Sequence, residues 1–423
     1  MHLEPDALDS GAYPIDADRL AVRTPPASGR REPLFPEPLH VGAPNLGDRD
    51  RFLERVTDVL DRRWLTNRGH YAKELERSLA DLLGVKHCVV LCNATVALEV
   101  AVRATGLTGE VIVPSFTFVA SAHALQWLGI TPIFCDVDPR THNLDPRRVE
   151  ELITPRTTGI MGVHLWGRPC AVDALEAIAR RHELTLIFDA AHAFACSFGG
   201  RMIGNFGDAE VFSFHATKFF NTFEGGAIAT NDDDLARRVL QMSNFGFVTE
   251  DTVVSLGTNG KMNEMCAAMG VTLLESLPDL VLSNYRNYVR YRNELSDVPG
   301  VTLLEHDERE RCNYQYIVIE VDPEVAGVSR DELVEILRSY NVRARRYFHP
   351  GCHRMEPYRT LYPEAGERLA ETERLCARVM ALPTGTVVGP AAIQGICDLI
   401  RSAIRNRRRA RTRAGSRLRI VPS

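Results

Sequence analysis

Short apolar runs alternate with amphipathic segments over much of the chain. We predict buried strands at residues 87–91, 111–113, 132–134, 159–163, 185–188, 211–214 and 227–230. Apolar residues recur at helical spacing between them, and we predict helices at residues 95–104, 118–128, 146–152 and 172–182. Strands separated by helices imply right-handed crossovers and a buried, mainly parallel sheet. The pattern therefore predicts an α/β fold whose large domain holds a seven-stranded sheet.

The flanking segments have different patterns. We predict helices at residues 48–63 and 72–83, joined by the turn-bearing loop WLTNRGHY at residues 64–71. After residue 277 we predict helices at residues 279–295, 330–339, 366–379 and 390–405, with strand-like segments at 301–304 and 314–321. This second pattern predicts a smaller α+β domain. The predicted division is a flexible leader (1–37), a large domain (38–276), a small C-terminal domain (277–406) and a basic, disordered tail (407–423).

Composition narrows the class of protein. The 423 residues carry a net charge of −5, so the whole molecule is not a polyanion binder. The basic run near the C-terminus has no recognition helix or stacking aromatics beside it, and we predict no nucleic-acid partner. We see no apolar run long enough for a bilayer and no apolar signal core, which predicts a cytoplasmic protein without a membrane partner. Ten scattered cysteines without a CxxC pair indicate free thiols and no metal.

The candidate chemistry is concentrated in residues 185–230. One predicted strand is followed by Asp189, and a second contains Ser213 and is followed by Lys218. Sites in α/β folds form at the carboxyl ends of strands. A lysine, an acid and a hydroxyl are what a pyridoxal phosphate (PLP) site needs, because they make the Schiff base, face the pyridinium nitrogen and hold the phosphate. Taken alone, Lys218 also fits a surface lysine, and Asp189 fits an acid that caps a turn.

Three further features fit such a site. Asn93-Ala94-Thr95 lies at a strand-to-helix junction, where backbone N–H groups bind phosphate, although ordinary helix capping explains the same residues. Phe118 follows a strand and fits either a ring that stacks on the cofactor or a core phenylalanine. His192 fits a group beside the cofactor ring or its phenolic oxygen, or a structural histidine.

Seven segments in one order carry a family resemblance: VLCNATVALEVA, VPSFTFVASAHAL, FCDVDPRTHNLDP, VHLWGRPC, FDAAHAFAC, SFHATKFFNTFEGGAIAT and LGTNGKMNEMCAAMG. Together they resemble the DegT/DnrJ/StrS-type PLP-dependent sugar aminotransferases over roughly residues 38–400. They are most similar to the branch that aminates C4 of nucleotide-linked 4-keto-6-deoxy sugars. The resemblance implies the aspartate-aminotransferase fold, PLP fold type I.

The resemblance also assigns roles. Lys218 matches the Schiff-base lysine and Asp189 the partner of the pyridinium nitrogen, which makes both catalytic. The other matched cofactor positions are the phosphate-cup residues Ala94, Thr95 and Ser213, the ring-stacking Phe118, and His192. His192 stands where most members have the glutamine of DAAQA, and histidine adds a titratable group there.

Further positions imply a homodimer with shared active sites. Asn259 resembles the residue that reaches the phosphate from the partner subunit, and the WLTNRGHY loop resembles the segment that crosses to the neighbouring site. Lys261 replaces the family's usual arginine and lacks its bidentate fork. Tyr347 and His349, in RRYFHPGCH, resemble the substrate-side loop.

The predicted function is transfer of an amino group from an amino acid, L-glutamate by resemblance, to a dTDP-linked 4-keto-6-deoxy-hexose. The product would be a 4-amino sugar for secondary-metabolite, including antibiotic, or surface-glycan biosynthesis. Relatives that dehydrate carry histidine at the lysine position, so Lys218 argues against that chemistry. The alternatives are a 3-keto sugar or cyclitol ketone as acceptor, another PLP reaction such as aromatisation, and a non-catalytic regulatory protein.

Overall fold

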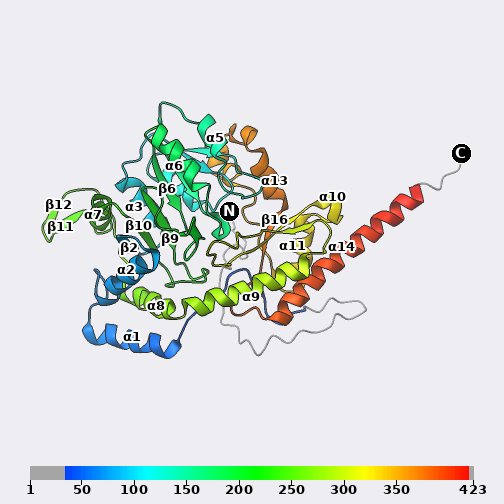
Figure 1. Cartoon of the computed structure of the whole chain (residues 1–423), viewed down its shortest axis with the longest axis horizontal. Helices are drawn as coiled ribbons and strands as arrows, with labels where there is room; N and C mark the ends of the chain where they lie inside the picture. The colour runs from blue at the N-terminus through cyan, green and yellow to red at the C-terminus, as the bar shows by residue number, and fades with distance from the viewer. Residues whose placement is uncertain (1–33, 419–423) are drawn as a thin grey trace, which may run out of the picture.

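A seven-stranded mixed sheet forms the centre of the larger lobe (Figure 1). The computed structural model describes residues 34–418, with side chains to residue 407. The strands are β2 (His87–Leu91), β3 (Glu110–Pro114), β4 (Thr131–Cys135), β5 (Thr157–Val163), β6 (Thr185–Asp189), β9 (Ala209–Ser213) and β10 (Gly226–Thr230). Their order is β2-β10-β9-β6-β5-β3-β4, and only β10 runs antiparallel to its neighbours. The predicted mainly parallel, seven-stranded sheet is confirmed.

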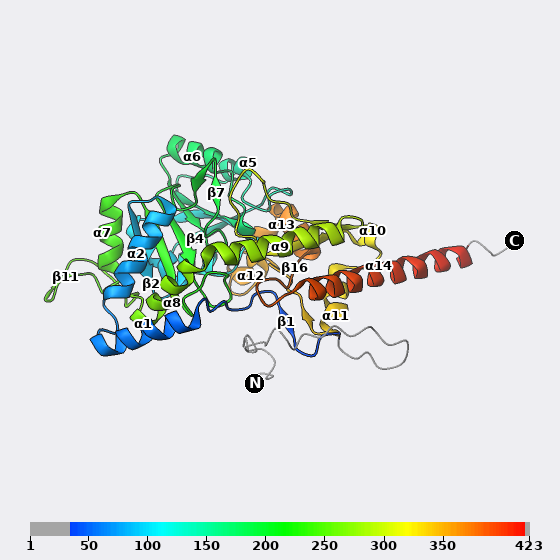
Figure 2. The same cartoon turned by 60° about the horizontal axis from the view of Figure 1, so that its bottom comes forward.

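Helices cover both faces of this sheet (Figures 1 and 2). They are α1 (Arg49–Arg62), α2 (His70–Leu83), α3 (Ala94–Ala104), α4 (Ala120–Trp127), α5 (Pro146–Glu151), α6 (Val172–Arg181), α7 (Asp233–Met242) and α8 (Glu264–Glu275). One core packs α2, α6 and α8 against the sheet, and another packs α3, α4 and α7 against it. Helices α7 and α8 are not among the elements predicted from the sequence. Helix α8 is buried around most of its circumference, so it lacks the one-sided apolar stripe that marks a surface helix.

The smaller lobe is an α+β unit. Its antiparallel sheet has the order β13 (Val301–Leu303), β14 (Ile317–Val321), β16 (Val379–Leu382). Its helices are α9 (Leu277–Leu295), α10 (Pro323–Ala326), α11 (Arg330–Arg338), α12 (Tyr358–Leu361), α13 (Ala370–Arg378) and α14 (Pro390–Leu418). Helix α9 bridges the two lobes (Figure 1). Two short hairpins extend from the larger lobe: β7 (Ser197–Phe198) with β8 (Arg201–Met202), and β11 (Phe247–Thr249) with β12 (Thr252–Val253).

The first described residues pack with the smaller lobe, which corrects the predicted boundary at residue 38. Leu34 and Phe35 are buried in the core of that lobe. Strand β1 (Leu39–His40) pairs in parallel with β15 (Val342–Arg343). Composition hid this arrangement, because the partners of these few apolar residues come from the other end of the chain. Residues 1–33 of the predicted leader lie outside the described residues.

The C-terminal helix is longer than predicted. Helix α14 continues through Leu418 and projects away from the body of the molecule (Figures 1 and 2). It covers residues 407–418, for which the sequence predicts disorder, because alanine and arginine are good helix formers. Residues 419–423 lie outside the described part. Between residues 34 and 418 no single helix is long and apolar enough to cross a membrane. Only α8 and α9 taken together have the required length and composition, and the chain bends by 66° between them.

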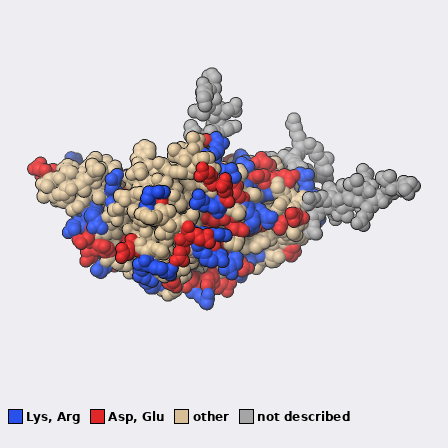
Figure 3. Space-filling view, turned by 90° about the horizontal axis from the view of Figure 1, so that it is seen from above, with Lys and Arg blue, Asp and Glu red and all other residues tan. Residues whose placement is uncertain are grey.

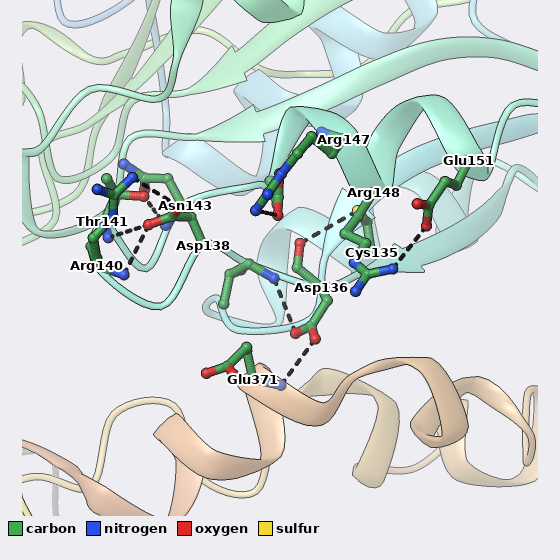
Figure 4. A network of polar contacts seen from close by, with 12 residues as sticks. Cys135, Asp136, Asp138, Arg140, Thr141, Asn143, Arg147, Arg148, Glu151 and Glu371 are labelled. Atoms are coloured by element: carbon green, nitrogen blue, oxygen red, sulfur yellow. Dashed lines mark hydrogen bonds and ion pairs between the residues drawn. The ribbon is translucent and has the colours of Figure 1, made fainter.

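The DVDP segment joins the two lobes through Asp136 (Figure 4). This buried carboxylate follows β4 and accepts hydrogen bonds from Glu371 N at 2.9 Å and from Thr372 N and Oγ1, both at 2.8 Å. These donors lie in the first turn of α13, where N–H groups have no partner within the helix. Asp136 therefore caps a helix of the smaller lobe from the larger one.

We expect Asp136→Ala to lower the free energy of unfolding by about 2–4 kcal/mol, because it leaves buried helix donors without an acceptor. Urea unfolding followed by circular dichroism measures the loss. Asp138→Ala is the matched control, since Asp138 accepts from Arg140 N and Thr141 N within its own loop. Equal losses for the two variants would contradict a clamp between the lobes.

Candidate active site

Strands β6 and β9 bring Asp189 and Lys218 to the same edge of the sheet. Asp189 is the last residue of β6, and Lys218 follows β9 in a turn closed by a hydrogen bond from its backbone N–H to His215 O at 2.8 Å. Lys218 Nζ donates to Tyr316 Oη at 3.1 Å. Tyr316 immediately precedes β14 of the smaller lobe, so the lysine lies where the lobes meet. Tyr316 is not among the site residues predicted from the sequence.

The surroundings of Lys218 favour its neutral amine. Burial lowers the pKa of Lys218 to about 8, against the opposing effects of Tyr347 and Asp189. A lysine with its ordinary pKa of about 10.4 is almost fully protonated at pH 8. The amine of Lys218 is therefore prepared to act as a nucleophile and as a proton acceptor near neutral pH.

Asp189 is a buried carboxylate held by two donors. Its Oδ2 accepts from Ser121 Oγ at 2.7 Å, and its Oδ1 accepts from Ala191 N at 3.0 Å. Burial raises the pKa of Asp189, opposed by these hydrogen bonds and by the charge of Lys218. A buried carboxylate that is fixed in this way suits a cationic ring nitrogen as its partner. Ser121 is on α4 and, like Tyr316, is not among the site residues predicted from the sequence.

His192 is buried beside aromatic rings. Its ring centroid lies 4.5 Å from that of Tyr316 and 5.7 Å from that of Trp166. Its Nδ1 accepts from Trp166 N at 3.3 Å, so the proton of the neutral ring is on Nε2. Burial, aided by the charge of Lys218, lowers the pKa of His192 well below its usual value. His192 is therefore a neutral N–H donor, which is the role that a glutamine amide can also fill.

The predicted phosphate-cup residues surround Gly226. Register pairs Gly226 with Ser213, at the end of β9. A Cβ on Gly226 would lie 2.8 Å from Ala94 N, so glycine allows β10 to pass against the first turn of α3. Asn93 caps this helix by accepting from Val96 N at 2.9 Å. The first backbone N–H groups of a helix have no partner within it, and such ends bind anions. Thr95 lies exposed in the same turn.

Phe118 and the substrate-loop residues Tyr347 and His349 differ in how far they are exposed. Phe118 is 56% exposed, so the alternative of a core phenylalanine is wrong. The Tyr347 ring is part-buried, with its centroid 6.1 Å from that of Trp166. His349 is exposed.

Asn259 and Lys261 lie beyond the edge strand β2, where Cys92 N donates to Gly260 O at 2.7 Å. The Asn259 side chain is exposed. Lys261 Nζ donates to Asn244 Oδ1 at 2.9 Å and lies 4.8 Å from the Phe245 ring centroid. Lys261 thus binds its own loop, and the phosphate role predicted for Asn259 stays a prediction.

Covalent loading of Lys218 with PLP should depend on pH. Because the neutral amine is the nucleophile and its pKa is about 8, loading should rise with pH, reach half its maximum near pH 8 and level off above it. Borohydride reduction followed by peptide mass spectrometry measures the loaded fraction. Asp189→Asn removes a charge that raises this pKa, so its midpoint should move to lower pH. A midpoint near pH 10 in the unmodified protein would contradict the effect of burial.

The fold and the site together define a class of protein. A mainly parallel sheet with a smaller α+β lobe beside it is the aspartate-aminotransferase fold, PLP fold type I. The lysine and the acid at the strand ends of this sheet lie where the two lobes meet. A sequence model of the DegT/DnrJ/EryC1/StrS aminotransferase family matches residues 47–401, and this chain belongs to that family. It is therefore an enzyme, a transaminase, as its sequence predicts.

Alignments with individual relatives and with a solved structure cover most of this chain. A dTDP-4-amino-4,6-dideoxy-D-glucose transaminase of Shigella dysenteriae is 36% identical over 367 residues, 86% of this chain and 99% of the relative. A GDP-perosamine synthase of Caulobacter vibrioides is 36% identical over 324 residues, 76% of this chain and 86% of the relative. A crystal structure of DesI in the presence of its TDP-sugar product superimposes with a TM-score of 0.84 at 49% identity, covering 90% of this chain and 97% of DesI.

Proposed function

We propose that this enzyme uses PLP to transfer an amino group from L-glutamate to C4 of a dTDP-linked 4-keto-6-deoxy-hexose. The observation that carries the proposal is the presence, at one edge of the sheet, of a half-buried Lys218 and a buried, doubly hydrogen-bonded Asp189. The nucleotide sugar is supported by DesI and by the Shigella relative, whose names specify a TDP-sugar product and a dTDP-4-amino sugar. The 4-amino sugar would enter secondary-metabolite or surface-glycan biosynthesis.

The residues present fit the cofactor. Ser213 and the first turn of α3, where Thr95 is exposed, would hold its phosphate. Asp189 would face the ring nitrogen, and Lys218 would hold the cofactor covalently. His192 would donate from Nε2, and the exposed ring of Phe118 would stack on the cofactor. When bound, PLP supplies an electron sink that stabilises a carbanion on the reacting carbon.

The chain's own residues supply the proton transfers. Lys218 Nζ, whose pKa of about 8 leaves half of the amine neutral at that pH, would take the proton from the α-carbon of glutamate and later deliver one to C4 of the sugar. Tyr316 Oη positions that nitrogen from the smaller lobe. Asp189 would stay ionised throughout, since Ser121 and Ala191 donate to both of its oxygens. The same residues thus serve both halves of the reaction.

We also propose a homodimer with shared active sites. Trp64 and Leu65 of the WLTNRGHY loop are 57% and 53% exposed, and Leu53 and Leu60 of α1 are exposed beside them. Buried Glu264 holds this loop by accepting from Gly69 N at 3.0 Å and Tyr71 N at 2.7 Å. A fixed apolar loop of this kind is suited to contact a second subunit. Figure 3 shows the opposite side of the molecule from α1, where uncharged side chains lie beside mixed acidic and basic ones. Sedimentation analysis tests the dimer.

The enzyme is proposed to work in the cytoplasm, which suits ten cysteines that are all free thiols.

The test of the function is amination of a defined acceptor. The PLP-loaded enzyme is incubated with glutamate and, separately, with a dTDP-linked 4-keto-6-deoxy-hexose, its GDP-linked counterpart, a dTDP-linked 3-keto sugar and a cyclitol ketone. Mass spectrometry of the products identifies the acceptor. We expect the dTDP-linked 4-keto sugar to be aminated at the highest kcat/KM. Preference for the GDP-linked sugar would follow the Caulobacter relative instead. Amination of only the 3-keto sugar or the cyclitol would overturn the proposal.

A further inference from the structure

Two buried cysteines face each other where the larger lobe meets the segment that leads into β14. Ser197 N donates to Arg311 O at 3.0 Å, and Arg311 N donates to Ser197 Oγ at 2.8 Å. These contacts align residues 196–198 with residues 310–312 in opposite directions. Cys196 and Cys312 are therefore the next opposed pair. Both side chains are buried and both are free thiols.

The sulfur of Cys312 lies among hydrogen-bond donors. It is 3.3 Å from His306 Nδ1, and Tyr314 N donates to it at 3.3 Å. Burial opposes ionisation of Cys312, but hydrogen bonds from the Cys196 thiol and His306 outweigh it and lower the pKa of Cys312 well below its usual value. Burial raises the pKa of Cys196. These donors therefore favour ionisation of Cys312 over ionisation of Cys196.

A second buried pair of neighbouring thiols shows the opposite arrangement. Cys352 Sγ donates to Thr117 O at 3.4 Å, and Cys376 Sγ donates to Phe348 O at 3.5 Å. Each sulfur faces a carbonyl oxygen, which favours the protonated thiol. Burial raises the pKa of both Cys352 and Cys376 to about 12. This pair is a matched control for burial and proximity without the donors.

We propose that Cys312 and Cys196 form an oxidation site for hydroperoxides. The Cys312 thiolate attacks the terminal oxygen of the peroxide, a sulfur–oxygen bond forms, the O–O bond breaks, and the alcohol or water leaves after protonation. The sulfenic acid on Cys312 then reacts with the Cys196 thiol, giving a disulfide and one water. Two electrons pass from the two sulfurs to the peroxide, so the step needs no further reactant.

The position of this pair links it to the catalytic residues. Asn313, next to Cys312, donates from Nδ2 to His192 O at 2.9 Å, and Gln315 Nε2 donates to the same oxygen at 2.9 Å. Tyr316 follows and accepts from Lys218. A disulfide between Cys196 and Cys312 would tie the segment carrying these three residues to the loop after β6. Exposure to peroxide would therefore form a disulfide at the junction of the two lobes.

The test treats the PLP-loaded, full-length enzyme with hydrogen peroxide, blocks the remaining thiols by alkylation and maps peptides without reduction. We expect a Cys196–Cys312 disulfide, with Cys352 and Cys376 still alkylated. In Cys196→Ser the sulfenic acid should persist on Cys312 and be trapped by dimedone. His306→Gln should slow oxidation of Cys312 by about 10-fold, because it removes the imidazole that stabilises the thiolate.

Two outcomes would overturn the proposal. One is that Cys196 and Cys312 remain reduced while peroxide oxidises other cysteines. The other is that Cys312 reacts no faster than Cys352 or Cys376, since burial and proximity alone would then explain its behaviour. Circular dichroism of each variant, compared with the unmodified enzyme, checks that a slow reaction does not come from loss of the fold.

Discussion

Lys218→Ala should lower kcat for amination of the nucleotide sugar by about 10⁴-fold or more, because it removes both the covalent attachment of the cofactor and the base that moves the proton. Burial lowers the pKa of this lysine to about 8, so a larger fraction of its amine is neutral than for an ordinary lysine. Stopped-flow or mass-spectrometric assays with glutamate and the keto sugar measure the rate. The variant should still bind the nucleotide sugar, which equilibrium binding to the purified protein checks.

Tyr316→Phe is the matched control for Lys218. It removes only the hydroxyl that accepts from Lys218 Nζ at 3.1 Å and leaves the aromatic ring beside His192. Its kcat should fall by about 10-fold or less, the worth of one hydrogen bond. If Lys218→Ala retained the rate of the unmodified enzyme, no role of Lys218 in proton transfer would stand, whatever substrate is aminated.

The sequence predicted the parts of the site that follow from strand ends. Asp189 ends one short apolar run and Lys218 follows another after a turn, and parallel strands deliver such residues to one edge of the sheet. Gly226, the second glycine of EGG, was recognisable from the sequence as part of a motif. Its physical reason, the close approach to Ala94, required coordinates.

The residues that sequence reasoning missed act across long separations. Ser121 lies 68 positions from Asp189, and Tyr316 lies 98 positions from Lys218. A serine or tyrosine carries no local signal of such a partner, because only the packing of α4 and of the smaller lobe creates the contact. The same limit explains Leu34 and Phe35, whose buried environment is built by residues from the C-terminal part of the chain.

His192 shows what coordinates add to a residue that the sequence had identified. The sequence left open whether a titratable group in place of glutamine would change the site. The hydrogen bond from Trp166 N to Nδ1 fixes the neutral tautomer, and burial keeps the ring uncharged. Histidine and glutamine then both present a neutral N–H donor at this position. The substitution therefore keeps the hydrogen-bond donor, which the residue types alone do not show.

Asp189→Asn should lower kcat by about 10²–10³-fold, the usual effect of removing a fixed charge from a reacting centre. The amide has nearly the shape of the carboxylate but cannot hold a proton on the ring nitrogen by charge. In the unmodified protein Ser121 Oγ and Ala191 N both donate to carboxylate oxygens of Asp189. In the variant one of these two donors would face the NH₂ group of asparagine instead. Steady-state kinetics, with absorbance to confirm cofactor loading, measures the effect.

Ser121→Ala separates the charge of Asp189 from its positioning. It removes one donor to Oδ2 and keeps the carboxylate, so kcat should fall by only about 10-fold. Its effect on pH dependence has a definite sign. Burial raises the pKa of Asp189, and loss of a donor to the ionised form raises it further, so the acidic limb of the rate profile should move to higher pH in Ser121→Ala. That limb should be absent from Asp189→Asn, and a limb at the same pH in all three proteins would assign it to another group.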